Sequence, residues 1–319
     1  MSTKAQPKTP ITAADICIIT PTKGRHKQLD CLLTTLAAQT QPVGKIIIAD
    51  GGGDAEALIA SHQDKLPVIW LDCPQPGQIL QRNYALQHLP GFARIIIYFD
   101  DDIQLTPDAV AILLAFWNAQ DKAPAGVSFN ITNMPKQPDN MFRHIFVMAS
   151  EPRGRVWKSG YNSPVTGVKQ DIQSQWLIGG ATAWRRDVLE NRTNEGIPSR
   201  WAITEDLMFS YPVSKSGNDL YVCAAAKVLH IDNTPTETFK AGIFRGNSAV
   251  LWRYLFVTSH SELSGIAMVW MILGQIAGRI VQGLRGRGWN FGYALGYAKG
   301  LSICALSKLT RRDIREFFD

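Results

Sequence analysis

Three adjacent carboxylates, Asp100, Asp101 and Asp102, follow directly after the apolar run 95–99. This run does not alternate apolar with polar residues, which is typical of a strand buried on both faces of a parallel sheet. Ligands bind beyond the carboxyl ends of such strands, so we expect the carboxylates at the rim of a cleft. Their mutual repulsion would be relieved by a divalent cation, and hard oxygen ligands favour Mg²⁺ or Mn²⁺. The alternative is a polar turn that caps the following helix.

A second acidic pair, Glu205 and Asp206, follows Thr204. Thr204 is a plausible helix cap, and two acids in a first helical turn are favoured by the helix dipole. A carboxylate here is equally suited to act as the general base for a hydroxyl group. His230 ends the strand-like run 220–229, where it is either a metal ligand or a structural histidine.

Asp50 ends the apolar run 45–49 and precedes three glycines. It is placed to bind a ligand that approaches the backbone closely, although an ordinary Gly-rich turn explains the pattern as well. No Gly-Lys-Ser/Thr and no Gly-x-Gly-x-x-Gly accompanies these glycines. A phosphate-binding P-loop and a nicotinamide dehydrogenase are therefore disfavoured.

Alternating strands and helices are needed to bring these residues to one edge. The pattern predicts strands at 15–20, 45–49, 68–71, 94–99, 125–129, 142–148 and 220–229. It predicts helices at 29–38, 55–62, 77–89 and 107–118, and a further helix that starts near 184–189. The Gly-rich stretch 153–167 is expected to be a loop that faces the substrate or closes over it. Such alternation is typical of an α/β fold with a mostly parallel sheet.

Length and composition agree with a globular protein that has a sizeable core. The 319 residues are 45% hydrophobic, enough for a sizeable core. Five Cys without a Cys-x-x-Cys pair disfavour a disulfide framework or a zinc site and suit a reducing cytosol. Residues 1–14 are polar and lack the apolar core of a secretory signal, so we interpret them as a flexible tail.

The C-terminal part is basic and apolar. From Lys240 onward the chain holds 11 Lys or Arg and 4 Asp or Glu, a surplus of +7, so the remainder carries −1 of the total +6. Residues 263–278 carry no charge, yet at about 1.5 Å per residue they reach roughly 24 Å, short of the roughly 30 Å hydrocarbon core. Gly288, Gly292, Gly296 and Gly300 line one face of a second helix.

We interpret these two segments as a helical hairpin lying on an anionic membrane surface, the cytoplasmic leaflet. A hairpin packed on the core, or used for oligomerisation, is the main alternative. A spanning hairpin would place Arg285 and Arg287 on the far side, against the positive-inside tendency.

Taken in order, the motifs resemble those of the family 2 glycosyltransferases, which have the GT-A fold. Residues 21–25 (Pro-Thr-Lys-Gly-Arg) resemble the family's opening Pro-x-x-x-Arg, and Asp50 matches the acid that ends its second strand. Residues 100–102 match Asp-x-Asp, and residues 204–206 match the Thr-Glu-Asp of inverting members. Residues 77–86 resemble Gly-x-x-x-Ala-Arg-Asn-x-Gly but depart from it at Gln81 and Ala85. A weak likeness to rhamnosyltransferases lies at 244–247.

The resemblance implies a role for each matching residue. Asp206 would be the catalytic base, with Glu205 as the fallback. Asp102 would bind Mn²⁺ or Mg²⁺ directly, with Asp100 and His230 completing the site. Acceptor-side residues would be Gly179 and Gly180. The donor would be held by Pro21, Thr22, Arg25, Asp50, Arg82, Asp100 and Asp101.

The expected protein is an α/β enzyme with a GT-A domain at 15–235 and a C-terminal helical segment at 236–319. It would be an inverting, metal-dependent transferase that moves one sugar from a UDP-, GDP- or dTDP-sugar to a lipid-linked or cell-envelope glycan. Single transfer is expected because the processive Gln-x-x-Arg-Trp motif is absent. We expect a cytoplasmic protein that lies peripherally on the inner face of the cell membrane. No nucleic acid partner is expected, and the protein could form an oligomer. The alternatives are an inactive GT-A scaffold of a membrane glycan complex and a sugar nucleotidyltransferase.

Overall fold

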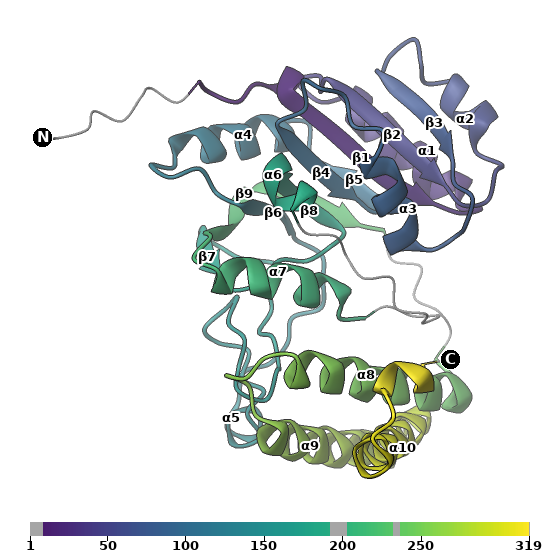
Figure 1. Ribbon diagram of the computed structural model, residues 1–319, viewed down its shortest axis with the longest axis vertical. Coiled ribbons are helices and arrows are strands. Elements are labelled where there is room, and N and C mark those ends of the chain that lie inside the picture. The colour runs from purple at the N-terminus through teal and green to yellow at the C-terminus, as the bar shows by residue number, and fades with distance from the viewer. Residues whose placement is uncertain (1–8, 192–202, 232–236, 319) are drawn as a thin grey trace, which may run out of the picture.

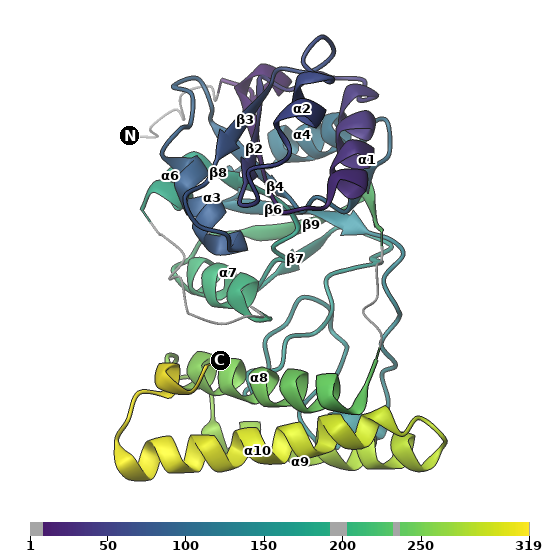
Figure 2. The same ribbon diagram turned by 90° about the vertical axis from the view of Figure 1, so that its right-hand side faces the viewer.

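The computed structural model describes residues 9–191, 203–231 and 237–318. A central sheet with helices on both faces forms one end of the molecule, and a layer of long helices forms the other (Figure 1). Figure 2 shows the three longest helices running side by side along this second end, away from the first strands. The chain is thus an α/β domain with a helical C-terminal layer, as the sequence predicts.

The sheet is mostly parallel, with an antiparallel strand inserted near its middle. Its spatial order is β3 (Val68–Asp72), β2 (Lys45–Asp50), β1 (Ile16–Thr22), β4 (Ile95–Phe99), β8 (Ala181–Arg185), β6 (Gly126–Ile131), β9 (Leu220–His230) and β5 (Ile103–Leu105). β7 (Ile172–Ser174) pairs with β9 outside this path. β8 is antiparallel to both β4 and β6, and β5 is antiparallel to β9.

Continuous apolar runs explain why the central strands form. All residues of β1 and β4 are buried, as expected for strands covered by helices on both faces. Thr22 at the end of β1 lies in register with Asp50 at the end of β2. Because β4 is also parallel to β1, the polar residues after these three strands gather at one edge of the sheet.

Helices cover this sheet, and those that follow β1, β2 and β3 start close to its polar edge. They are α1 (His26–Ala37), α2 (Glu56–Ala60), α3 (Gln78–Leu86), α4 (Ala109–Ala119), α6 (Arg186–Glu190) and α7 (Glu205–Lys215), with a 3-10 turn η1 (Ala13–Asp15) before β1. In α1 the buried residues are Leu29, Leu32, Leu33 and Leu36, the face that the helical spacing predicts.

The predicted strand at 142–148 is wrong, because this segment contains the short helix α5 (Met141–Ile145). The Asn140 side chain caps it by accepting a hydrogen bond from the Arg143 N–H at 3.1 Å. Phe142 and Phe146, four residues apart, lie on one side, with ring centroids 4.8 Å apart, and Phe146 stacks on Trp270 at 4.7 Å. A short apolar run has no reliable period, and this docking decides its structure.

The C-terminal layer consists of α8 (Phe239–Thr258), α9 (Gly265–Leu284) and α10 (Trp289–Thr310), followed by the 3-10 turn η2 (Ile314–Phe317). Helix α8 was not predicted from the sequence, and the glycine-lined helix was expected to pair with α9 alone. The glycines of α10 instead face α8: a Cβ at Gly296 would overlap the Ile243 carbonyl, and one at Gly300 would lie 2.6 Å from Val250 Cβ. Small residues therefore let the backbones of α8 and α10 approach closely.

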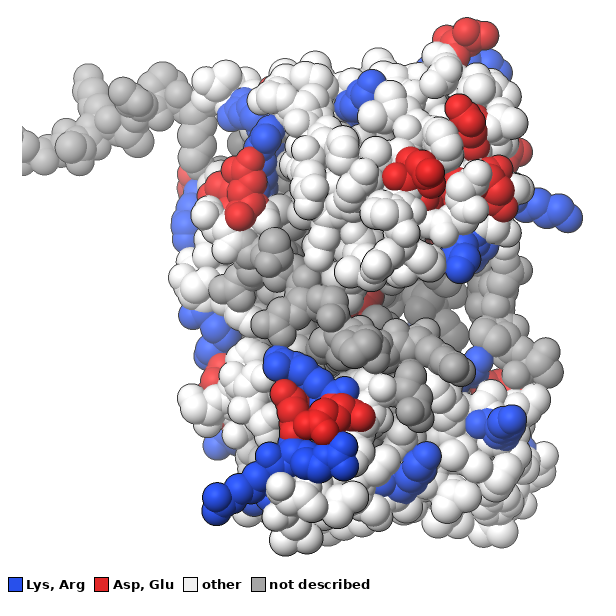
Figure 3. Space-filling view, turned by 45° about the vertical axis from the view of Figure 1, so that its right-hand side comes forward, with Lys and Arg blue, Asp and Glu red and all other residues white. Residues whose placement is uncertain are grey.

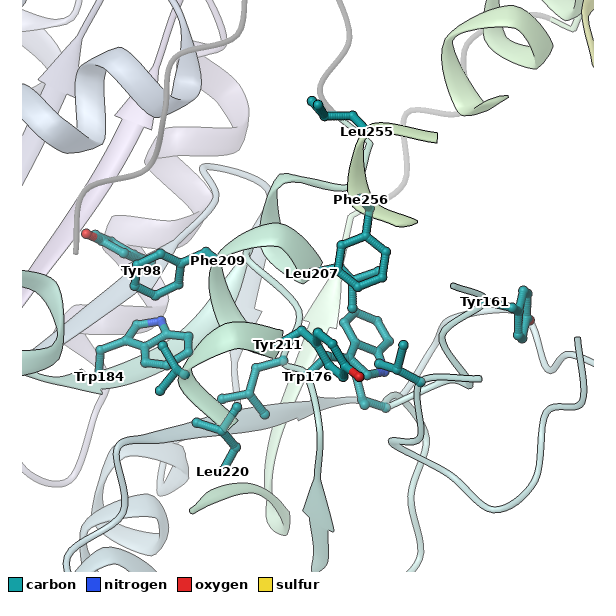
Figure 4. Packing of buried hydrophobic residues seen from close by; sticks show 14 of the residues in the cluster. Tyr98, Tyr161, Trp176, Trp184, Leu207, Phe209, Tyr211, Leu220, Leu255 and Phe256 are labelled. Atoms are coloured by element: carbon teal, nitrogen blue, oxygen red, sulfur yellow. The ribbon is translucent and has the colours of Figure 1, made fainter. Parts of the chain in front are cut away.

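The two ends of the molecule share one core. Trp184 of β8 and Phe209 of α7 meet edge to face at 4.9 Å, and Tyr211 of α7 meets Phe256 of α8 at 5.4 Å. Figure 4 shows these aromatic rings in the layer between the sheet and the C-terminal helices. The helical layer is thus tied to the sheet through α7.

The described part of the predicted tail, residues 9–14, is bound to the domain. The Ile11 N–H donates to Asn118 Oδ1 at 2.9 Å, and Asn118 Nδ2 donates back to the Ile11 carbonyl at 2.8 Å. Arg94 donates to the Pro10 carbonyl at 3.3 Å. These contacts correct the expectation of a flexible segment for residues 9–14, and residues 1–8 lie outside the described part.

Candidate active site

The polar edge of β1 and β4 holds an ion-paired cluster. Thr22 Oγ1 donates to Asp101 Oδ2 at 2.8 Å. The Arg25 guanidinium, just before α1, lies 2.8 Å from Asp101 and 2.7 Å from Asp102. Burial raises the pKa of Asp101 to about 6, against the opposing effects of Arg25 and Thr22. Arg25 therefore reduces the repulsion between the two carboxylates by pairing with both.

Asp100 is held from the other side by α3. Its Oδ1 accepts hydrogen bonds from Gln78 Nε2 at 2.6 Å and from Arg82 Nη2 at 2.7 Å. Arg82 is buried, and its guanidinium also donates to the Gly179 carbonyl at 3.2 Å and lies 5.0 Å from the centre of the Tyr98 ring. Gln78 and Arg82 share one helix face because they are four residues apart.

Gln81 fixes α3 to the sheet beneath this cluster. Its amide donates to the carbonyls of Thr22 at 2.8 Å and Ala49 at 2.6 Å, and its side-chain oxygen accepts from the Gly77 N–H at 3.0 Å. Gln81 is one of the two departures from the family pattern noted in the sequence. Its buried amide joins the ends of β1 and β2 to the helix that carries Arg82.

The residues that would hold a metal are Asp102 and His230. Asp102 Oδ1 is buried without a hydrogen-bond donor and lies 3.3 Å from His230 Nε2. His230 is placed there because it pairs in register with Ile103, directly after the carboxylates. An orphaned carboxylate oxygen beside an imidazole fits a divalent cation. The described residues contain no group of three or more metal-binding side chains, so a cation would take its remaining ligands from water or substrate phosphates.

Asp50 is buried and its carboxylate is already hydrogen bonded. Oδ1 accepts from the Gly52 N–H at 2.8 Å, and Oδ2 accepts from the Ala55 N–H at 2.9 Å and from Trp70 Nε1 at 3.1 Å. Burial would raise the pKa of this carboxyl, but these hydrogen bonds lower it. The side chain thus shapes the Gly-rich turn, and its nucleotide-binding role remains a prediction.

The second acidic pair lies in the first turn of α7. Burial raises the pKa of Glu205 and of Asp206, and the charge of Asp206 raises that of Glu205 further. Asp206 Oδ1 accepts from the Leu207 N–H at 2.7 Å, and a backbone hydrogen bond from Gly179 opposes the burial effect. The Thr204 side chain makes no capping hydrogen bond, so this helix start lacks the predicted cap.

Gly179 and Gly180 bring the two acidic groups into one site. The Asp100 N–H donates to the Gly180 carbonyl at 2.9 Å. A Cβ at Gly180 would lie 3.0 Å from Asp100 Cγ and closer still to Oδ2, while a Cβ at Gly179 would lie 3.3 Å from Asp206 Cβ. This turn is therefore the thin wall between Asp100 and Asp206.

A cavity of about 310 Å³ opens over the first cluster. It is lined by Pro21, Thr22, Lys23, Arg25, Gln78, Gln81, Asp100 and Asp101. The predicted donor residues Pro21, Thr22 and Arg25 thus meet Asp100 and Asp101 in one space. The structure adds Gln78 and Gln81. The four-residue spacing of Gln78 from Arg82 was the available signal for Gln78, whereas Gln81 stood out only as a departure from the family pattern.

Arg253 of α8 is a functional candidate that no motif in the sequence indicates. Its guanidinium donates to the Gly160 carbonyl and to Asn162 Oδ1, the latter at 3.1 Å. Burial lowers its pKa to about 10, and it interacts electrostatically with Asp206. The C-terminal layer therefore contributes a cation that faces the candidate base.

Comparison with known proteins shows the family. The profile of glycosyl transferase family 2 matches residues 17–193, more than half of the chain. A search of curated protein sequences found no match. Solved structures that share the fold include a mannosyltransferase from Pyrobaculum calidifontis, TarS 1–349 from S. aureus and GalNAc-T7.

The mannosyltransferase structure, which holds GDP-Man and Mn²⁺, has 13% identity and a TM-score of 0.56 over 97% of this chain and 92% of its own. TarS has 14% identity and a TM-score of 0.53 over 84% and 73% of the two chains. GalNAc-T7, solved with UDP, GalNAc and Mn²⁺, has 17% identity and a TM-score of 0.53 over 69% and 45%. With its GT-A sheet and its two groups of carboxylates, this chain belongs to glycosyl transferase family 2 and is a glycosyltransferase.

Proposed function

We propose that the protein is an inverting, metal-dependent transferase that moves one sugar from a nucleotide-sugar to a hydroxyl group of a lipid-linked or cell-envelope glycan. The observation that carries this proposal is the turn at Gly179 and Gly180, which separates Asp100 on the donor side from Asp206 on the other. A displacement in line needs a leaving-group site and a base on opposite sides of the reacting carbon, and this turn lies between such groups.

The donor would occupy the cavity at the end of β1. Arg25 and Arg82 offer guanidinium donors for the diphosphate, and Asp50 remains the proposed contact for the base. Mn²⁺ or Mg²⁺ held by Asp102 and His230, with Asp100 nearby, would neutralise charge developing on the leaving diphosphate. Two related structures hold Mn²⁺ with GDP-Man or with UDP, which supports this assignment.

Asp206 is the proposed base. Burial raises its pKa, so it binds a proton more readily than an exposed aspartate and still ionises near neutral pH. It would take the proton from the acceptor hydroxyl as that oxygen bonds to the anomeric carbon and the bond from this carbon to the diphosphate breaks. The single displacement inverts the configuration and needs no covalent intermediate. Glu205 is the fallback base, and its higher pKa makes it the weaker candidate for an ionised group.

We propose a peripheral position on the cytoplasmic face of the membrane. Among the described residues, α9 is the helix long and apolar enough to cross a bilayer, with a mean hydropathy of 1.3 and 22% of that stretch buried. Several of its apolar residues are exposed, among them Ile266 and Leu284, and Arg285 and Arg287 follow at its C-terminal end. An amphipathic helix with this charge supports surface binding better than crossing.

Thermal-shift measurements against UDP, GDP, dTDP and CDP, with and without Mn²⁺, test the proposal. We expect stabilisation by one nucleotide that requires Mn²⁺, and its base would identify the donor class. The rival proposals are an inactive scaffold and a sugar nucleotidyltransferase. A scaffold shows no metal-dependent shift, whereas a nucleotidyltransferase is stabilised by a nucleoside triphosphate with a sugar phosphate. Either result would contradict the proposed transfer.

A further inference from the structure

A groove of about 770 Å³ runs between α5 with its flanking loops and the helices α9 and α10. It is distinct from the donor cavity, with which it shares no lining residue. One wall carries Gln137, Arg143 and Tyr161, and the other carries Gly278, Arg279, Gln282, Arg285 and Tyr297. Phe142, Met148 and Val281 supply apolar surface between them.

The groove is strongly cationic. The described residues that line it include Arg143, Arg279 and Arg285 and no Asp or Glu. Arg143 donates only to neutral oxygens, Gln137 Oε1 at 3.0 Å and the Tyr161 hydroxyl at 2.5 Å, and its Nε is buried without a hydrogen-bond acceptor. Arg279 donates to Asn290 Oδ1 at 2.8 Å and lies 4.2 Å from the centre of the Tyr293 ring. Within the described part of the chain, neither arginine has a carboxylate partner, so their charge favours an anionic ligand.

The groove opens between two exposed apolar surfaces. On α5 these are Met141 and Ile145, with Met141 77% exposed. On α9 they include Ile266 and Leu284, which are 87% and 75% exposed. Exposed apolar side chains in such number mark an interaction surface. In Figure 3 the lowest part of the molecule, which the C-terminal helices form, is largely uncharged, and Lys and Arg side chains lie above it together with a group of Asp and Glu.

The groove is linked to the candidate base through Arg253. Tyr161 and Tyr297, which line it, both interact electrostatically with Arg253. Arg253 in turn faces Asp206 and donates to the Gly160 carbonyl next to Tyr161. A ligand that fills the groove therefore lies on the acceptor side of the catalytic centre.

We propose that this groove binds the phosphate or diphosphate head of a long-chain lipid, with Arg143 and Arg279 holding the head and the chain leaving between α5 and α9 into the bilayer. This inference rests on the proposed function and names its acceptor class: a sugar linked to a lipid through a phosphate group. Charge complementarity selects the anionic head, and the apolar surfaces on both sides of the opening select a lipid over a soluble phosphate ester.

Vesicle flotation of the full chain tests the assignment. Phosphatidylcholine vesicles would carry either hexadecyl phosphate or phosphatidylglycerol, adjusted to the same zeta potential. We expect at least tenfold tighter binding to hexadecyl phosphate, because its single chain can leave between α5 and α9, whereas the two acyl chains of phosphatidylglycerol cannot both do so. Equal binding to both vesicles would overturn the groove assignment. Complete loss of vesicle binding in 10 mM inorganic phosphate would overturn it too, because the groove would then not prefer the lipid to free phosphate.

Variants separate the groove from general charge. R143Q and R279Q should each lower the preference for hexadecyl phosphate at least fivefold. Gly278→Phe should do the same without changing a charge, since a Cβ there meets only Phe142, at 3.9 Å, and a helix gains stability when glycine is replaced. The matched control, K299Q with K308Q, removes two exposed charges of α10 outside the groove and should keep the preference.

The same variants separate this proposal from the proposed function. All of them should retain the Mn²⁺-dependent nucleotide shift, because the groove does not touch the donor cavity. A nucleotide shift in the native chain without any lipid preference would refute the groove and leave the transferase intact. A lipid preference without any nucleotide shift would refute the donor site instead. Unchanged preference in R143Q, R279Q and Gly278→Phe alike would show that the lipid binds elsewhere.

Discussion

Gly180→Ala should damage the active site through one methyl group. The added Cβ would lie 3.0 Å from Asp100 Cγ and closer still to its Oδ2. Carbon atoms pack best at about 3.5–4.0 Å, so the carboxylate must move by about 0.5–1 Å. Asp100 cannot move freely, because Gln78 and Arg82 hold its Oδ1 at 2.6 and 2.7 Å. The strain should appear as lost stability of about 1–3 kcal/mol, the usual cost of overpacking.

Function should suffer more than folding. A misplacement of about 1 Å in a catalytic arrangement can lower turnover on the order of 100-fold, or about 2.7 kcal/mol of transition-state stabilisation. The assay is hydrolysis of the nucleotide-sugar that the thermal shift identifies, with its Kd measured by calorimetric titration. The fall in kcat/KM should include a weaker Kd, because Asp100 lies in the donor cavity.

Gly179→Ala is the matched control. Its Cβ would lie 3.3 Å from Asp206 Cβ and 3.4 Å from Arg82 Nη1, contacts that shifts of a few tenths of an ångström relieve. Neither glycine has a positive φ, so alanine brings no backbone strain at either position. We expect less than a roughly threefold effect for this variant. Equal activity of the two alanine variants would refute the idea that Gly180 keeps Asp100 in place.

Further predictions concern the acids and the helical layer. Asp102→Asn should abolish the Mn²⁺-dependent part of nucleotide binding in calorimetry, and unchanged metal dependence would move the metal site elsewhere. Asp206→Asn should keep donor binding and lose turnover, while the native rate rises with pH through about 6, the pKa to which burial raises Asp206. Because a buried carboxylate with a raised pKa destabilises the fold once ionised, the same variant should be more stable than the native chain in urea at pH 7.5, and this gain should vanish below about pH 4. Ile266→Glu with Leu284→Glu should abolish vesicle flotation with an unchanged Tm, since both side chains are exposed; persistent flotation would contradict membrane contact through α9. Gly296→Leu should lower stability by several kcal/mol in urea denaturation, since it forces α10 from α8, and a native-like midpoint would contradict that packing.

Much of the sheet edge formed by β1, β2 and β4 could be predicted from sequence, and for a physical reason. The runs that end at Asp50 and Phe99 are apolar over the full length of a strand. A strand buried on both faces of the sheet is the structure that accommodates such a run. Parallel neighbours then bring their polar ends together. The side-chain pairing within the cluster could not be predicted. The ion pairs of Arg25 with Asp101 and Asp102 depend on the backbone path of the turn between β1 and α1.

The part of the molecule formed by α5 and the C-terminal helices could not be predicted to the same degree. Segment 142–148 was predicted as a strand, because Phe142 and Phe146 reveal their helical spacing only where α9 offers Trp270 and Gly274 to pack against. Helix α8 has small residues, Gly242 and Gly246, on the face toward α10. It therefore shows almost no amphipathic period, and its packing against α10 could be recognised only in the tertiary structure.

In the proposed metal site, Arg25 would also set the order in which ligands associate. Its guanidinium pairs with Asp101 and Asp102, so a cation arriving alone would compete with an internal positive charge. A nucleoside diphosphate would offer Arg25 a new partner and free Asp102 for the metal. Each ligand would then strengthen the binding of the other by the same factor, as linkage requires. The protein should bind free Mn²⁺ weakly and hold it firmly only together with its donor.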